Sequence, residues 1–220
     1  FMLKEIFEQP QAISDTLAGT LGDDHVLTAI LGPEAETRLA DIANIHIVAC
    51  GTSYHAGLVA RYWIEEQAGL PCQVEVASEY RYRSVVVPAN TLLITISQSG
   101  ETADTLAAME EAGRKGARQI TLCNYPGTQT TRIADSTMQI RAGLEISVAG
   151  SKTFVCSLTA LYLLAIHMGI RRGTLAGDAR GERIAELARL PDMLGGMLAD
   201  ESQYQALAKR YGRRSDFLYL

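Results

Sequence analysis

The sequence predicts an α/β fold: a three-layer α/β/α sandwich with a five-stranded parallel sheet and flanking helices. Two observations indicate this class. Short apolar segments typical of buried strands alternate along the 220 residues with longer segments of helical periodicity. Single helices separate the strands, which favours βαβ units, a parallel sheet and right-handed crossovers.

The individual elements follow from the apolar pattern, in chain order. Helical patterns cover residues 3–20 and 34–42. Strands are expected at Ile45–Cys50, Gln73–Ala77, Thr91–Ile96, Arg118–Cys123 and Ser136–Ile140. Helices are expected at Tyr54–Ala68, at Ala103–Lys115 and at Lys152–Ile170, the last of which is apolar and therefore central.

The C-terminal part differs in character from the rest. A helical pattern covers Glu182–Leu190 and is followed by Pro191, and a further helix is expected at Gln203–Arg210. Residues 216–220, which are apolar from Phe217 onward, are then typical of a strand without partners. We therefore expect a helical lead-in over 1–44, a main domain over 45–172, a helical connector over 173–215, and at 216–220 the first strand of a second domain, cut short.

Composition excludes several classes of function. The net charge is −5 and no basic stripe is present, which argues against nucleic acid as a partner. No apolar run reaches the length of a membrane span, and the first residues lack a signal-peptide core, so no membrane partner is expected. The four cysteines show no metal-ligand spacing, and reduced thiols in a cytoplasmic protein are expected.

The most informative segment follows the strand at Thr91–Ile96. Ser97, Gln98, Ser99 and Thr102 lie between this strand and the start of the next helix. The first N–H groups of a helix have no intrahelical partner and carry partial positive charge. Three hydroxyls and an amide beside such a helix start favour a phosphate monoester. The alternative is ordinary helix capping by serine and threonine.

A second turn has the same composition. Cys50, Gly51, Thr52 and Ser53 follow the first strand, and the carboxyl ends of parallel strands share one edge of a sheet, where ligands bind. Helix capping is again the alternative for Thr52 and Ser53. Cys50 has no evident partner base, and His55 is typical of a surface histidine. No glycine-rich nucleotide motif is present, which disfavours dinucleotides and nucleoside triphosphates.

A third segment joins the last strand to the long apolar helix. Gly150 and Ser151 open this helix, and Lys152 lies in its first turn, where a positive charge is unfavourable. Either a bound anion or an acidic neighbour would compensate this charge. Glu145 is the candidate neighbour, in a simple Lys152–Glu145 ion pair.

These three segments resemble the sugar isomerase (SIS) domain, which has a flavodoxin-like sheet. More narrowly, they resemble the first SIS subdomain in the isomerase half of the glutamine–fructose-6-phosphate aminotransferase family. The segments Lys4–Pro10, Arg61–Trp63 and Ala77–Arg83 strengthen this resemblance, which runs nearly end to end.

The resemblance implies the roles of individual residues. Ser97, Gln98, Ser99 and Thr102 would hold the phosphate of fructose 6-phosphate or glucosamine 6-phosphate. The residues that would face the sugar are Thr52, Ser53 and the backbone of Val148 and Ala149. One departure is that Gly150-Ser151 stands where the family commonly has serine and threonine, so that one sugar-facing hydroxyl is lost.

The resemblance also implies what lies outside this chain. A glutaminase domain would precede Phe1, and a second SIS subdomain with the acid and base residues would follow Leu220. No catalytic residue is therefore assigned here, and no metal or cofactor is expected. The chain would bind a phosphosugar without turnover and form a homodimer. Two alternatives stay open: a non-catalytic module that senses a phosphosugar, and an SIS isomerase or deaminase for another phosphosugar.

Overall fold

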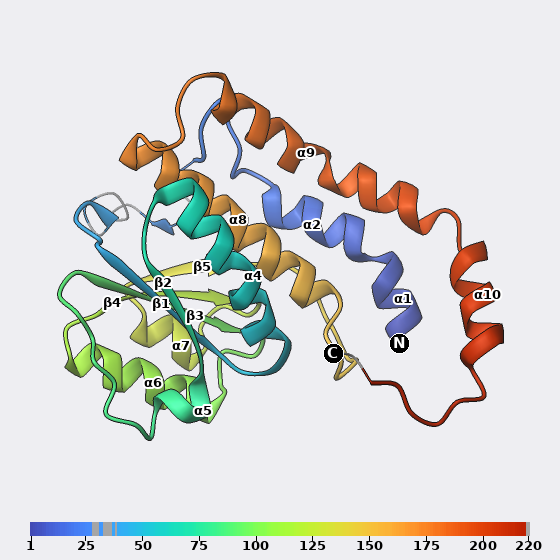
Figure 1. Ribbon diagram of the computed structural model, residues 1–220, viewed down its shortest axis with the longest axis horizontal. Coiled ribbons are helices and arrows are strands. Elements are labelled where there is room, and N and C mark those ends of the chain that lie inside the picture. The colour runs from blue at the N-terminus through green and yellow to red at the C-terminus, as the bar shows by residue number, and fades with distance from the viewer. Residues whose placement is uncertain (28–30, 33–36, 38, 219–220) are drawn as a thin grey trace.

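The computed structural model describes residues 1–27, 31–32, 37 and 39–218. Five strands form one sheet in which every neighbouring pair is parallel. In the order β2-β1-β3-β4-β5 (Figure 1), they span Cys72–Val76, Asn44–Ala49, Thr91–Ser97, Arg118–Cys123 and Ser136–Gln139. The predicted fold class is confirmed, and each strand lies within two residues of its expected bounds.

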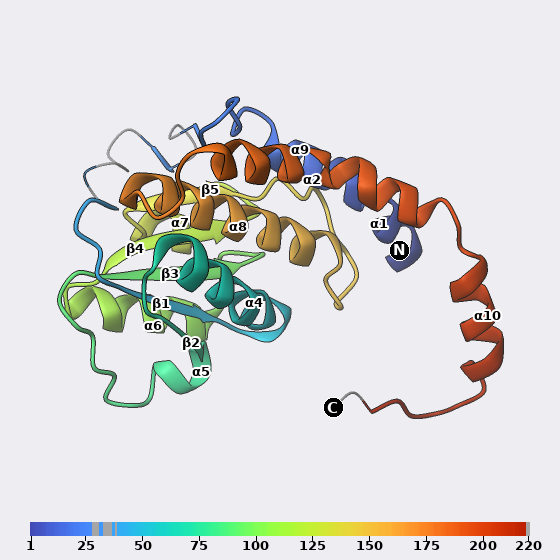
Figure 2. The same cartoon turned by 45° about the horizontal axis from the view of Figure 1, so that its top comes forward.

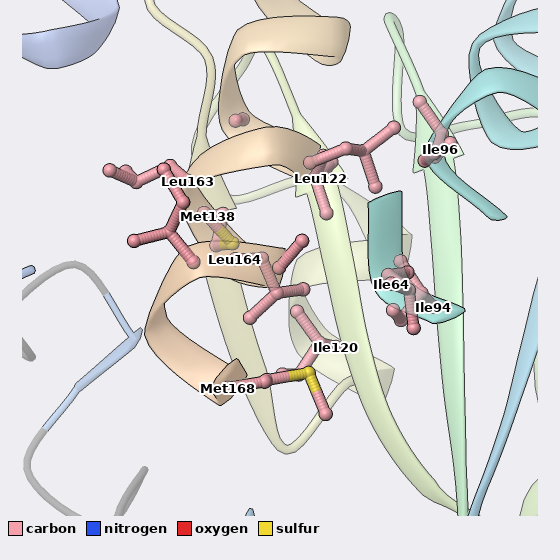
Figure 3. Packing of buried hydrophobic residues seen from close by; sticks show 14 of the residues in the cluster. Ile64, Ile94, Ile96, Ile120, Leu122, Met138, Leu163, Leu164 and Met168 are labelled. Atoms are coloured by element: carbon pink, nitrogen blue, oxygen red, sulfur yellow. The ribbon is translucent and has the colours of Figure 1, made fainter. Parts of the chain in front are cut away.

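Helices cover both faces of the sheet (Figures 1 and 2). One face is covered by α4 (Gly51–Ala68) and α8 (Lys152–Arg172), and the other by α5 (Ala77–Tyr80), α6 (Ala103–Arg114) and α7 (Gln129–Ile133). Ile94 and Ile96 of β3 pack toward Ile64 of α4 and Leu164 of α8 (Figure 3), whereas Leu93 belongs to the opposite core. Because successive side chains of a strand alternate between faces, an apolar strand such as β3 is buried on both sides.

The remaining helices lie outside this sandwich. Helices α1 (Met2–Phe7) and α2 (Gln9–Leu17) run beside α8, and α9 (Asp178–Leu198) packs along α2 (Figure 2). Helix α10 (Ser202–Tyr211) contains no buried residue and stands away from the sheet in both views. Of these outer helices, the N-terminal ones approach the loop that leads into α8.

The helix expected over 3–20 is two helices, because Pro10 interrupts the hydrogen-bond ladder. Proline has no N–H, and its ring clashes with the carbonyl four residues earlier, here that of Ile6. The Gln9 side chain supplies the missing donor, with Nε2 2.9 Å from the Ile6 oxygen. The chain bends at Glu8, which ends α1 and precedes α2.

Other expectations differ in detail. Helix α4 begins at Gly51 rather than Tyr54, and α9 continues through Pro191. Residues 216–218 form no regular structure, so the strand expected at 216–220 is absent from the part that is described, where no neighbouring strand pairs with it. Four of the nine residues in the helix expected over 34–42, namely 34–36 and 38, lie outside the described ranges, as do residues 219 and 220.

Helix α8 is long and apolar enough to cross a membrane by length and composition alone, contrary to the expectation that no segment is. In this fold 72% of its most apolar stretch is buried inside the protein. A core helix packed on a sheet is apolar for the same physical reason as a spanning helix.

Helix α8 approaches α4 so closely at Gly169 that a side chain has no room there. A Cβ at this position would lie 2.5 Å from the backbone oxygen of Gln67. We predict that Gly169→Ala lowers the free energy of unfolding by about 1–3 kcal/mol, as overpacked substitutions do. Chemical denaturation measures this change.

The matched control is Gly181→Ala in α9, where a Cβ would meet no atom within 4 Å. This substitution is expected to leave stability unchanged or raise it by up to about 1 kcal/mol, because alanine favours helix more than glycine does. Equal effects of the two substitutions would contradict the close approach of α8 to α4.

Candidate functional site

A cavity of about 370 Å³ lies at the carboxyl ends of β1 and β3. In this strand order the chain leaves β1 and β3 toward opposite sides, and this reversal opens a crevice between the two ends. The cavity is lined by Cys50, Gly51, Thr52, Ser53, Ile96, Ser97, Gln98, Ser99, Thr102, Thr105, Glu145, Val148, Gly150 and Thr153. The structure thus brings together seven of the eight residues expected to bind a ligand; the eighth, Ala149, is not among the lining residues.

The turn after β3 is shaped by its own hydroxyls. Ser97 Oγ accepts the N–H of Gly100 at 3.0 Å and lies 3.4 Å from Thr102 Oγ1. Ser99 Oγ accepts the N–H of Glu101 at 3.2 Å. Both serine oxygens act as acceptors toward the backbone, which leaves the Ser99 proton for a ligand, whereas Ser97 and Thr102 share one proton between their two oxygens.

Glycine is required at position 100. Its φ of 67° lies in the left-handed region, and a Cβ would lie 2.1 Å from Thr128 Oγ1. The residue also accepts the N–H of Thr130, which opens the next crossover, at 3.1 Å. The turn is therefore held in place by the segment that follows β4.

Three helix N-termini, those of α4, α6 and α8, face this cavity, and a protein carboxylate satisfies only that of α8 among the described residues. At the start of α8, Glu145 Oε1 accepts the N–H groups of Ser151 and Lys152, both at 2.7 Å. At the start of α6, Thr102 makes no capping bond through its side chain. The start of α4 also has no side-chain cap, but the hydroxyls of Ser97, Ser99 and Thr102 lie beside the start of α6. The open N–H groups of α6 therefore offer the better place for an anion.

A nearby ion pair preserves the positive character of this helix start. Asp104 lies in the first turn of α6, where its charge would oppose that of a bound anion. Arg81 donates to Asp104 Oδ1 at 2.7 Å, and this hydrogen bond raises the pKa of the guanidinium. The pair offsets the negative charge beside the turn.

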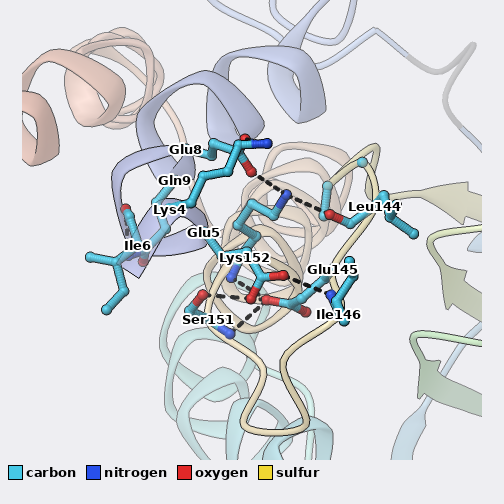
Figure 4. Close-up of polar contacts among 12 residues, drawn as sticks. Lys4, Glu5, Ile6, Glu8, Gln9, Leu144, Glu145, Ile146, Ser151 and Lys152 are labelled. Carbon is cyan, nitrogen blue, oxygen red and sulfur yellow. Dashed lines mark hydrogen bonds and ion pairs between the residues drawn. The ribbon is translucent and has the colours of Figure 1, made fainter. Parts of the chain in front are cut away.

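The prediction that Lys152 forms an ion pair with Glu145 is wrong. The Lys152 ammonium is buried and donates to Glu8 Oε2 at 2.7 Å and to the Leu144 oxygen at 2.8 Å (Figure 4). Glu145 instead binds backbone N–H groups and accepts the Gln98 amide at 3.4 Å. The lysine side chain points toward α1, away from the carboxylate that its own backbone contacts.

The second turn contributes hydroxyls from the first turn of α4. Thr52 and Ser53 both line the cavity. A Cβ on Gly150 would lie 3.6 Å from Thr52 Oγ1 and 3.4 Å from Glu145 Oε2. Glycine at position 150 therefore widens the cavity between Thr52 and Glu145, where a serine would place its side chain.

Nucleophilic catalysis by cysteine and metal-dependent chemistry have little support among the described residues. The four cysteines are free, as expected, and only Cys50 is partly exposed, with no base beside it among the lining residues. His55 is exposed and lies outside the lining. No group of three or more His, Cys, Asp or Glu side chains within the described residues is placed to hold a metal ion.

Sequence reasoning missed two features of the cavity. The Glu145 side chain caps α8 by accepting backbone N–H groups. Glu145 lies six residues before Ser151, a spacing that no helical or strand period predicts. Thr153 lines the cavity and is nearly buried, and its hydroxyl has no partner among the described residues. A threonine in the first turn of an apolar helix has no sequence signature that separates it from core.

A second hollow, of about 400 Å³, lies at the β5 edge of the sheet. Two of the hydrogen-bond donors that line it are already bound to oxygens of the protein. The single proton of the Thr16 hydroxyl there is shared between the backbone oxygens of Ala12 and Ile140. The Arg141 guanidinium donates to two carbonyls at the end of α2. This hollow therefore offers a ligand fewer free donors than the cavity beyond β1 and β3.

Comparison with curated proteins gives relatives along the whole chain. Glutamine–fructose-6-phosphate aminotransferase [isomerizing] of Pseudomonas putida is 49% identical over 221 aligned positions, which cover 100% of this chain and 36% of that protein. The protein of the same name from Haemophilus influenzae is 43% identical with the same coverage. The chain spans about a third of the length of these relatives.

Comparison with solved structures points to the same kind of protein. The C-terminal domain of glucosamine-fructose-6-phosphate aminotransferase from Francisella tularensis superposes with a TM-score of 0.93 at 36% identity, over 97% of this chain and 60% of that one. Glucosamine-6-phosphate deaminase from Thermotoga maritima, at 18% identity, shares the fold with a TM-score of 0.63 over 83% of this chain and 52% of that one.

Residues 38–167, which include all five strands and the cavity, match the SIS domain. The expectation drawn from the three segments is confirmed, and the chain belongs to the SIS domain family.

Proposed function

We propose that the cavity binds a phosphosugar, fructose 6-phosphate or glucosamine 6-phosphate, as the sugar-phosphate site of a glutamine–fructose-6-phosphate aminotransferase. The observation that carries this proposal is the uncapped N-terminus of α6 beside three hydroxyls. A phosphate monoester has three oxygens to satisfy, and these donors suit it. A volume of about 370 Å³ lies within the usual range for small-molecule sites.

The residues divide between the two parts of the ligand. Ser97, Gln98, Ser99 and Thr102 bind the phosphate, because they surround the open end of α6. Thr52 and Ser53 face the sugar across the cavity, together with the backbone of Val148 and Ala149. The first three of these line the cavity, and Ala149 is next to Val148 in the loop.

The parent protein would make glucosamine 6-phosphate from fructose 6-phosphate and glutamine, without a metal or organic cofactor. The names of relatives that are 43–49% identical support this activity. We propose that 45–172 is the SIS domain, that 173–215 is a connector, and that a glutaminase domain and a second SIS subdomain complete the protein. The free cysteines support a cytoplasmic location.

Within this chain we assign binding and no catalysis. Among the described residues, Glu145 is the only carboxylate that lines the cavity, and it is engaged with the N-terminus of α8. A sensing module or another phosphosugar isomerase would use the same phosphate contacts. Helices α1 and α2, which resemble the start of the aminotransferase isomerase half, favour the aminotransferase.

Removal of one hydroxyl tests the phosphate site. Ser99→Ala is expected to weaken binding of fructose 6-phosphate by about 0.5–1.5 kcal/mol, and by more where the phosphate charge strengthens the bond. Isothermal titration calorimetry measures the dissociation constant. Ser202→Ala in α10, an exposed serine far from the cavity, is the control. Wild-type binding with unchanged affinity in Ser99→Ala would refute the assignment.

Catalysis is tested with the purified 220-residue chain. We expect no conversion of fructose 6-phosphate with either glutamine or ammonia, because proton transfer needs acid and base groups positioned within hydrogen-bond reach. A coupled assay for glucosamine 6-phosphate decides this. Turnover well above the buffer blank would show that catalytic groups lie within this chain.

The exposed apolar residues of the C-terminal part point to self-association as a homodimer. Leu207, Tyr211, Phe217 and Leu218 all lie exposed. Apolar patches of this kind favour association. Light scattering over a concentration series is expected to give a mass near twice 23.9 kDa at high concentration. A constant mass of one chain would contradict the homodimer.

A further inference from the structure

The loop between β5 and α8 separates two hollows, and residues 144–151 of it form a wall of both. Glu145, Val148 and Gly150 line the candidate cavity on one side. Leu144 and Ile146 line a hollow of about 420 Å³ on the other side, beneath α1. Neighbouring residues of this loop therefore face opposite ways, and the position of the loop sets the shape of the sugar side of the cavity.

A buried carboxylate of α1 holds the middle of this wall. Glu5 is only 4% exposed, and its Oε1 accepts the N–H of Ile146 at 2.7 Å (Figure 4). Both oxygens of Glu5 also lie 3.3 Å from the N–H of Ser147. Hydrogen bonds from the Ser147 side chain and from the backbone of Ile146 lower the pKa of Glu5. The carboxylate is therefore charged at neutral pH and accepts from the residues directly before Val148.

A second contact from the same end of the chain holds the start of the wall. Lys152 joins Glu8 to the backbone oxygen of Leu144 through its buried ammonium. Hydrogen bonds from Lys152 and then Lys4 lower the pKa of Glu8. Glu145 fixes the other end of the wall at the N-terminus of α8. Between these two ends, Glu5 supplies the side-chain hydrogen bonds that reach the loop from another element within the described residues.

We propose that Glu5 is a positioning residue for the sugar part of the ligand, so that the N-terminal helix α1 belongs functionally to the binding site. The inference rests on the proposed function. Glu5 contacts no lining residue of the phosphate turn; it acts by keeping Ile146 and Ser147, and with them Val148, at the edge of the cavity. Preorganised site loops reduce the cost of ordering on binding.

Amide hydrogen exchange tests the contact itself, without any ligand. In Glu5→Gln the side chain keeps its size, but it has one acceptor oxygen and brings N–H groups toward N–H groups. We expect exchange at Ile146 and Ser147 to speed up by at least about tenfold. The amides of Ser151 and Lys152, held by Glu145, should change little and report that the domain is folded. Unchanged exchange at Ile146 and Ser147 would overturn the proposal.

Calorimetry with two ligands tests the consequence for binding. Glu5→Gln should weaken the binding of fructose 6-phosphate by at least about threefold. It should leave the binding of inorganic phosphate unchanged, because only the sugar contacts the loop. A general loss of structure would weaken both. Leu3→Ala on the same helix is the matched control, because the Leu3 side chain is exposed.

Equal affinity of wild type and Glu5→Gln for fructose 6-phosphate would overturn the positioning role and leave the proposed function standing. Wild-type protein that binds neither ligand would contradict the proposed function, and with it the effect of Glu5 on affinity.

Discussion

The parallel pairing of β1 with β3 is the constraint on which the candidate site depends. Ala49 pairs with Ile96 in this register, so that Cys50, which follows β1, comes next to Ser97, the last residue of β3. Two turns that lie more than forty residues apart in sequence therefore meet at one edge. Because β2 lies on the other side of β1, the helices that follow diverge and leave the cavity open between them.

The second determinant of the candidate site is whether a protein group or a ligand satisfies the N–H groups at each helix N-terminus. Glu145 satisfies the start of α8 with a carboxylate from the protein, whereas the start of α6 has hydroxyls around it and no side-chain cap. An anion that enters the cavity would meet repulsion at one helix and free donors at the other. In the function we propose, this asymmetry would orient a sugar phosphate, with its phosphate toward α6 and its sugar toward Thr52 and the loop before α8.

The sequence was sufficient to predict the sheet and most of the cavity, because both depend on local patterns. Apolar runs gave the five strands, and hydroxyls placed directly after β1 and β3 gave the lining turns. Contacts between distant residues left no such pattern: Glu5 and Glu8 meet the loop and Lys152 across more than 130 residues. For the same reason Lys152 was assigned to Glu145, its nearest acidic neighbour in sequence. The bend at Glu8 could have been foreseen from Pro10, which cannot continue a helical ladder.

The structure of the chain with fructose 6-phosphate bound, determined by crystallography, tests the central claim most directly. The account predicts phosphate oxygens within hydrogen-bond distance of the Ser97, Ser99 and Thr102 side chains and of the first N–H groups of α6, with the sugar toward Thr52. A phosphate bound at the start of α8, or in the hollow beside β5 that Arg141 lines, would contradict it.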